Sequence, residues 1–133
     1  MLLSVAAVIG GFLATAILVG VSTAVASAAF GVEQKPDANA TAPTAYLAAN
    51  LFLSLLSAVV GGYICGWIAP SYPLVHAVVL AGLLGVLSLV TALTTGAAPG
   101  QPAWYPWVIG VIGMSGVVIG GFVRVLMTPI PPA

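Results

Sequence analysis

Few side chains in this sequence could carry out catalysis or bind a metal. Only Glu33, Lys35, Asp37 and Arg124 carry a formal charge, and the chain has one histidine, His76, and one cysteine. A metal centre needs a cluster of His, Cys, Asp or Glu, and a nucleophilic triad needs an acid next to its histidine. Both acids lie in a loop that we place on the membrane face opposite to His76. We therefore predict that the chain is not an enzyme.

His76 could ligate haem iron or chlorophyll magnesium as a single axial ligand. Haem held within a helix bundle often takes two ligands from facing helices, and the sequence has no second histidine. An interfacial histidine that bonds water or a carbonyl fits these facts better, and we expect no cofactor. Cys65 lies inside an apolar segment and has no partner for an internal disulfide, so we expect a buried, unreactive thiol.

The scarcity of charge also indicates the solvent of this chain. Charged residues make up 3% of it, whereas soluble domains contain about a quarter, so we expect it to lie in a lipid bilayer. Coupled transport of protons or sodium generally needs a carboxylate inside the membrane, and no apolar segment contains one. Two basic residues cannot neutralise a nucleic acid backbone. The expected partners are therefore membrane lipids and other membrane protein subunits.

The apolar residues form four runs long enough to cross a hydrocarbon core of about 30 Å, which takes about 20 helical residues. Backbone amides in lipid must be satisfied within the segment, and continuous apolar runs without alternation indicate helices rather than a barrel. Proline and polar residues gather between the runs, where helices would end. The sequence predicts an all-α membrane protein, a single transmembrane domain over residues 1–133, with four transmembrane helices as two antiparallel hairpins in an up-down-up-down bundle. The predicted helices span residues 2–30, 45–69, 74–95 and 107–127.

The first run allows an alternative interpretation. Residues 24–29, Ala-Val-Ala-Ser-Ala-Ala, have the small-residue pattern of a signal-peptidase site, and cleavage there would leave three spans. The preceding segment has no Lys or Arg and is long for a signal peptide. We therefore expect it to be retained as the first helix.

A glycine pair recurs in three of the four runs. Val8-Ile9-Gly10-Gly11-Phe12 returns as Val118-Ile119-Gly120-Gly121-Phe122, and the second run contains Val60-Gly61-Gly62-Tyr63. An up-down arrangement places these pairs at about the same depth, roughly 10 Å from one membrane face at 1.5 Å per residue. Helices in lipid associate through close backbone approach at small residues, so we expect one packing layer. The layer consists of these three pairs and of Ala81-Gly82 in the third run. The glycines predicted to pack helices, in this layer and in the rows spaced by four beside it, are Gly10, Gly11, Gly61, Gly62, Gly66, Gly82, Gly116, Gly120 and Gly121.

Hydrogen-bonding residues within the runs are few enough to weigh singly. Such residues commonly link neighbouring helices, at on the order of 1 kcal/mol each. We expect this role for Asn50, Ser54, Ser57, Thr91 and Ser115.

Arg124 gives the only clear indication of orientation. It lies about one turn from the end of the fourth run, which favours cytoplasmic termini under the positive-inside rule. We expect it to contact lipid phosphate, with a salt bridge to another subunit as the alternative. Aromatic residues should mark the headgroup levels, since their amphipathic rings prefer that region. These are Tyr46, Trp104, Tyr105 and Trp107 on the outer side, and Trp67 and Tyr72 on the inner side.

Several short motifs resemble those of small uncharacterised bacterial four-helix integral membrane proteins. They are a Gly-Gly-Tyr helix at 61–63, Trp-Ile-Ala-Pro at 67–70, the Pro-Leu-x-His-Ala start at 73–77, and Trp-Tyr-Pro at 104–106. The turn at 69–73 lacks the arginines that these proteins commonly have there, which weakens any headgroup contact at that turn. The resemblance implies a four-helix architecture and the bacterial inner membrane, and it implies no activity.

Two functions fit these expectations. The first is a non-catalytic subunit that packs through small-residue helix faces within a larger membrane complex, such as a respiratory or photosynthetic one. The alternative is a small homo-oligomeric channel or carrier in which Arg124 or His76 supplies selectivity. An anion or a neutral solute would suit it better than a cation, because no acidic ring is available.

Overall fold

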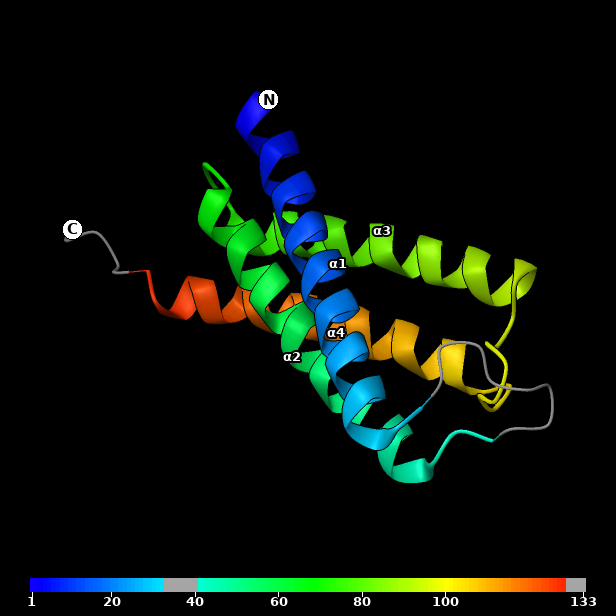
Figure 1. The fold of residues 1–133 in the computed structure, drawn as a ribbon. Coiled ribbons are helices and arrows are strands. Elements are labelled where there is room, and N and C mark those ends of the chain that lie inside the picture. The colour runs from blue at the N-terminus through cyan, green and yellow to red at the C-terminus, as the bar shows by residue number, and fades with distance from the viewer. Residues whose placement is uncertain (33–40, 129–133) are drawn as a thin grey trace.

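The chain folds into four helices in the computed structural model, which describes residues 1–32 and 41–128 (Figure 1). Each helix is long and apolar enough to cross a membrane, and no strand occurs in the described ranges. The predicted all-α membrane fold is therefore confirmed, and the predicted bounds agree with the observed ones to within two residues. The helices are α1 (Leu2–Phe30), α2 (Thr44–Ile68), α3 (Pro73–Thr94) and α4 (Tyr105–Leu126).

The helix ends follow from local chemistry. Gly31, with φ 63°, ends α1 in the left-handed conformation that glycine adopts without a steric penalty. Pro73 and Pro106 lie in the first turns of α3 and α4, where the missing amide hydrogen has no intrahelical acceptor anyway. This tolerance explains why α4 begins at Tyr105, two residues before the predicted start.

The helices pack as two antiparallel hairpins that cross one another (Figure 1). α2 lies between α1 and α4, and α4 also packs along α3, whereas α1 and α4 make no contact among the described residues. We call the end with Met1, the α2–α3 connection and the end of α4 the turn end. The opposite end, where α1 leads toward α2 and α3 toward α4, is the loop end.

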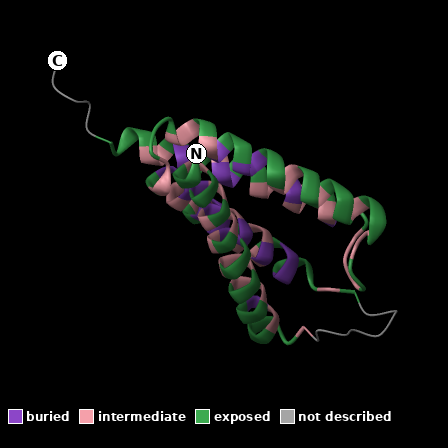
Figure 2. Cartoon of the chain, turned by 90° about the horizontal axis from the view of Figure 1, so that it is seen from above, coloured by how far each residue is buried: buried purple, intermediate pink, exposed green. Residues whose placement is uncertain are grey.

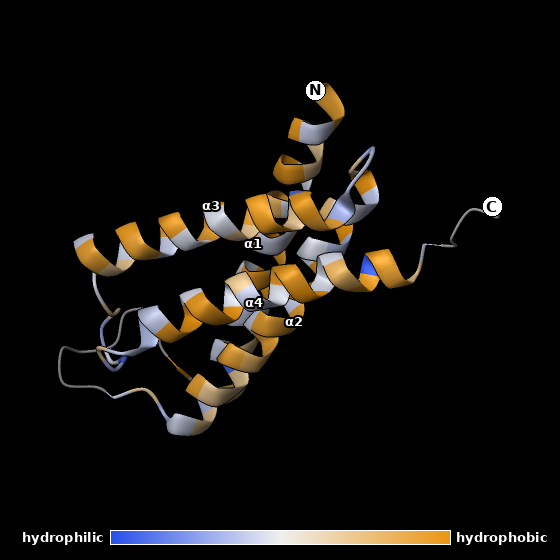
Figure 3. Ribbon diagram, turned by 180° about the vertical axis from the view of Figure 1, so that it is seen from behind, coloured by the Kyte–Doolittle hydropathy of each residue, from blue (hydrophilic) through white to orange (hydrophobic). Residues whose placement is uncertain are grey.

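Buried residues concentrate where the two hairpins cross (Figure 2). A larger cluster lies toward the turn end and a smaller one toward the loop end. The larger cluster consists of Ala7, Ala58, Cys65, Ala77, Leu80, Ala81 and Val117, and the smaller one of Ala26, Tyr46, Leu47 and Tyr105. Most large aliphatic side chains are exposed instead, and hydrophobic residues occur along the whole length of all four helices (Figure 3). This inside-out distribution suits a bundle surrounded by lipid.

Candidate functional site

Among the described glycines, the closest approach to the backbone of another helix joins α2 and α4, which run in the same direction. A Cβ atom added at Gly62 would overlap the carbonyl oxygen of Val117, and one added at Gly120 would overlap that of Val59. One added at Gly116 would lie 2.7 Å from the Cβ of Ala58. The two backbones therefore approach as closely as glycine allows, which maximises dispersion contacts in a solvent that offers no hydrophobic effect between helices.

α1 and α2 also approach each other closely at glycine residues. A Cβ atom at Gly11 would lie 2.9 Å from the carbonyl oxygen of Gly61 and 2.5 Å from the Cβ of Cys65. One at Gly61 would overlap the hydroxyl of Thr15, which donates to the carbonyl of Gly11 at 2.8 Å. Nearer the turn end, a Cβ at Gly10 would meet the Cδ1 of Ile68 at 2.7 Å.

α3 joins this packing through Ala77 and Leu80. A Cβ at Gly121 of α4 would overlap the Cβ of Ala77, and the Cδ2 of Leu80 comes within 2.7 Å of a Cβ built at Gly11. Leu80 is fully buried and so fills the space between α3 and the α1–α2 pair. We call these contacts at Gly11, Gly61, Gly62, Gly116, Gly120 and Gly121 the glycine layer.

Gly82 does not belong to the glycine layer, and its predicted place there is wrong. It is exposed, and a Cβ at this position would have no neighbour within 4 Å. Ala81, which is 5% exposed, faces the core instead. Because consecutive residues of an α-helix are rotated by about 100°, only one of two adjacent small residues can face a given neighbour.

A polar network crosses three helices at the loop end. Thr23 of α1 donates to the Oδ1 of Asn50 at 2.9 Å, and the Nδ2 of Asn50 donates to the hydroxyl of Tyr105 on α4 at 2.6 Å. Ser27 and Tyr46 share a hydrogen bond of 3.2 Å beside it. We call these five residues the loop-end network. It fixes the register of α1, α2 and α4 at the end of the bundle away from the glycine layer.

Two tyrosines of this network, Tyr46 and Tyr105, were predicted for the outer headgroup level, and the structure shows that their side chains are buried within the bundle. Tyr46 is 5% exposed and Tyr105 is 2% exposed, whereas Trp104 and Trp107 are about half exposed. The amide of Asn50 gives the tyrosine hydroxyl a partner inside the bundle. An asparagine in an apolar run signals the need for such partners, but the sequence does not identify them.

The other hydroxyl groups in the helices differ from our expectation. Three predicted interhelical groups, Ser57, Thr91 and Ser115, instead donate to the carbonyl four residues earlier in their own helix. Only Asn50, among the five residues named, links helices by its side chain. The Oγ of Ser54 is buried and has no hydrogen-bond partner in the described structure.

Substituting Asn50 tests how much the loop-end network stabilises the fold. Asn50→Ala removes two interhelical bonds and leaves the buried hydroxyl of Tyr105 without its donor. We expect a loss of about 1–3 kcal/mol in the free energy of unfolding, measured by denaturant titration in mixed micelles. Ser57→Ala, which removes a bond within one helix, is the matched control and should cost clearly less. Equal losses would show that the interhelical bonds add nothing.

His76 and Cys65 hold positions without a visible chemical role. The Nδ1 of His76 lies 3.1 Å from the carbonyl oxygen of Tyr72, one turn earlier. The described residues contain no group of three possible metal ligands. Cys65 is a free, fully buried cysteine in contact with the glycine layer.

Arg124 lies at the turn end, in the last turn of α4. Its Nη1 donates to the hydroxyl of Thr128 at 3.1 Å, while its Nε is buried without a partner among the described residues. Glu33, Lys35 and Asp37 lie outside the described residues. Arg124 is therefore the one side chain with a formal charge in the described part of the chain.

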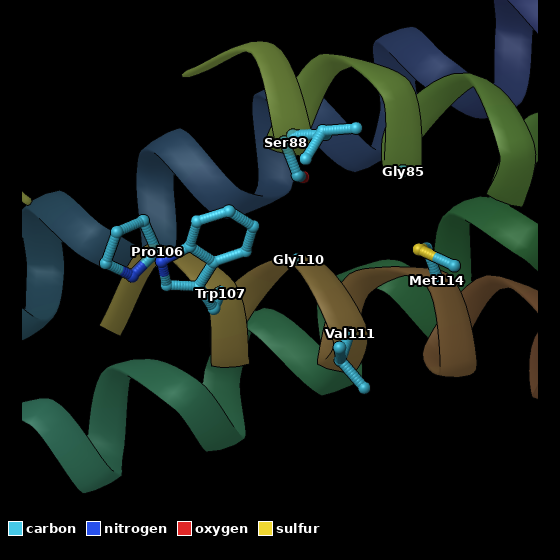
Figure 4. A pocket seen from close by; sticks show the side chains of 8 residues that line it. Gly85, Ser88, Pro106, Trp107, Gly110, Val111 and Met114 are labelled. Atoms are coloured by element: carbon cyan, nitrogen blue, oxygen red, sulfur yellow. The ribbon is translucent and has the colours of Figure 1, made fainter. Parts of the chain in front are cut away.

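A recess of about 140 Å³ opens between α3 and α4 toward the loop end (Figure 4). Gly85, Ser88 and Gly110 line this space, and Trp107 and Met114 lie along its α4 side. Its lining is mainly apolar and carries no ionisable side chain. It could accommodate hydrocarbon, and its lining has no ionisable side chain that could activate the hydroxyl of Ser88.

Comparisons with protein-family models, with curated proteins and with solved structures found no match. The structure itself defines the class: an integral membrane protein of four helices. Its interior consists of glycine-mediated helix contacts and one interhelical polar network. Each side chain of the loop-end network bonds another helix of the same chain.

Proposed function

We propose that this chain is a non-catalytic integral membrane subunit that packs against other membrane proteins in a larger complex, such as a respiratory or photosynthetic one. We place it in the bacterial inner membrane with both termini cytoplasmic. The observation that carries the proposal is the closure of the bundle at the glycine layer, where the backbones of α2 and α4 touch. Because the core is closed in this way, a partner helix can bind only to the outer faces of the helices.

The outer face of α1 supports this role. α1 packs chiefly on α2, which leaves a row of small residues spaced by four exposed on its surface. A Cβ at Gly20, within this row, would have no neighbour within 4 Å. Small residues at this spacing permit a second helix to approach closely in lipid. The row consists of Ala16, Gly20, Ala24 and Ala28.

The inward glycines are not candidates for partner contact. Eight of the nine glycines that we predicted for packing have close neighbours within the chain, so a partner would have to use other small residues. The packing faces of the proposed subunit are accordingly those left exposed on α1 and, around Gly82, on α3.

The alternative is a small homo-oligomeric channel or carrier for an anion or a neutral solute. Backbone contact between Gly62 and Val117 argues against a path through one copy of the chain. Any path would then run between copies, where Arg124 is the charged side chain of the described residues that could select an anion. The subunit role needs no such path and is the one we favour.

Purification from native membranes in a mild detergent tests the proposal. We expect a stoichiometric set of unrelated membrane subunits to accompany the chain and Gly20→Leu to lose them, since leucine holds the partner helix away. Val21→Leu changes a neighbouring exposed residue and should keep the partners. Both variants should unfold at the wild-type temperature. A homo-oligomer without other subunits that passes anions or neutral solutes in liposomes would overturn the proposal.

A further inference from the structure

The side chain of Arg124 is held in a notch between α2 and α3. A Cβ atom built at Gly66 would lie 3.2 Å from the Cβ and the Cγ of Arg124, and 3.2 Å from the Cβ of Pro73. The stem of the arginine thus occupies the space that a side chain at position 66 would fill. Gly66 is buried, so the notch is formed by helix packing and not by a surface loop.

The guanidinium group in this notch has N–H donors without an acceptor among the described residues. It has five N–H groups, of which one donates to Thr128, and its Nε is buried without an acceptor. The hydroxyl of Thr128 is neutral and donates to the carbonyl of Arg124 itself at 2.9 Å, so it does not balance the charge. Burying part of a charged group without an anion is costly, and none of the described residues supplies one, which points to an anion beyond them.

The described residues that flank the acidic segment of the sequence lie at the other end of the bundle. Val32 and Thr41, the described residues on either side of the segment that contains Glu33 and Asp37, lie at the loop end. Arg124 is 19 residues along α4 from Tyr105, a distance of about 28 Å at 1.5 Å per residue.

The first turn of α3 adds a second attraction for an anion. Pro73 begins this 22-residue helix, which has no acidic residue in its first turn and no side-chain cap. The amino end of a helix carries a partial positive charge of about half an elementary charge. Because Pro73 borders the same notch, this partial charge and the guanidinium act on the same region.

We propose that Arg124, seated in the Gly66 notch beside the amino end of α3, binds the phosphate group of an anionic glycerophospholipid. Arg124 lies two residues before the last residue of α4, where a transmembrane helix meets the headgroups. The planar guanidinium can grip two phosphate oxygens at once, which a point charge cannot. This site does not depend on the proposed subunit role, since it needs only this chain and lipid.

Native mass spectrometry of the purified chain in a non-ionic detergent tests the site. Phosphatidylglycerol is titrated, with phosphatidylcholine as the zwitterionic reference. We expect Arg124→Gln to lower the affinity for phosphatidylglycerol about tenfold or more, and Arg124→Lys to restore part of it. Equal binding of phosphatidylglycerol by the wild type and Arg124→Gln would overturn the proposal.

A substitution at Gly66 tests the contribution of the notch to lipid binding separately from the charge of Arg124. Gly66→Ala brings a Cβ atom against the arginine stem and should weaken phosphatidylglycerol binding while it keeps the charge. Gly82→Ala, at an exposed position, should leave binding unchanged. Thermal unfolding of each variant establishes that it is folded. Unaltered binding by a folded Gly66→Ala would overturn the role of the notch.

Two further arms identify the source of the anion. Inorganic phosphate at millimolar concentration should not displace phosphatidylglycerol from the wild type. Displacement at that concentration would assign the site to free phosphate and overturn the lipid assignment. Crosslinking at position 124 in native membranes should capture lipid, whereas capture of an acidic residue of another subunit would replace the lipid with a salt bridge.

Discussion

Gly62→Leu is expected to separate α2 from α4 and to destabilise the fold more than any other single substitution considered. A leucine at this position meets the carbonyl group of Val117, and a backbone atom cannot rotate away as a side chain can. Overpacking of a core typically costs about 1–3 kcal/mol, and we expect a loss at or above the upper end of that range. The free energy of unfolding in mixed micelles, followed by circular dichroism, measures it.

Gly82→Leu is the matched control for this prediction. The same change of residue then occurs at an exposed position with no neighbour within 4 Å, where substitutions usually alter stability by no more than about 0.5 kcal/mol. If both variants were equally stable, close backbone contact at Gly62 would not be what holds the bundle together. If both were equally damaged, helix propensity or insertion would be responsible instead of the contact.

Gly11→Val is expected to release α1 from the bundle and to expose Cys65. Valine at position 11 meets the Cβ of Cys65, the side chain of Leu80 and the carbonyl of Gly61. Cys65 is the one cysteine of the chain and is fully buried in the native packing. Its labelling by a membrane-permeant maleimide therefore reports on the contact between α1 and α2 without an engineered probe.

We expect Cys65 of Gly11→Val to be labelled about tenfold faster or more, since each 1.4 kcal/mol of local destabilisation raises an open population about tenfold. Gly20→Val places the same residue on the exposed face of α1 and should leave the labelling rate unchanged. A slow rate in both variants would mean that α1 tolerates a side chain at Gly11 by shifting as a rigid body, and the inferred closeness of α1 and α2 would then be wrong.

At the turn end the sequence identified Arg124 as a candidate site residue but not the residues around it. Arg124 could be recognised as a candidate lipid contact because a charge near the end of an apolar run is rare and reaches the headgroups. The sequence could not reveal that Gly66 and Pro73 form the notch that holds the stem of Arg124. The three residues belong to α2, α3 and α4, and only the tertiary structure brings them together. His76 could equally be recognised from its rarity, while its bond to the carbonyl of Tyr72 required the structure.

At the loop end the sequence identified a residue that links helices but not the residues that it bonds. Asn50 was expected to bond another helix, and it does, but its partners Thr23 and Tyr105 could not be chosen from the sequence. Tyr105 was expected among headgroups because aromatic residues near helix ends usually lie there. The position of a residue along a helix gives its depth, whereas its rotation toward a neighbour decides whether it is buried.

The sequence by itself determined the solvent of this protein and the number and limits of its helices. Those properties depend on local rules: a bilayer of fixed thickness, the need to satisfy backbone amides within each segment, and proline at the ends. Only the tertiary structure decided that Ala81 and not Gly82 faces the core, that α1 avoids α4, and that Arg124 occupies a notch beside α3. The physical reason is that these helices are apolar on every side. Their sequences therefore lack the amphipathic period that would show which face turns inward, and close packing of the backbones makes that choice.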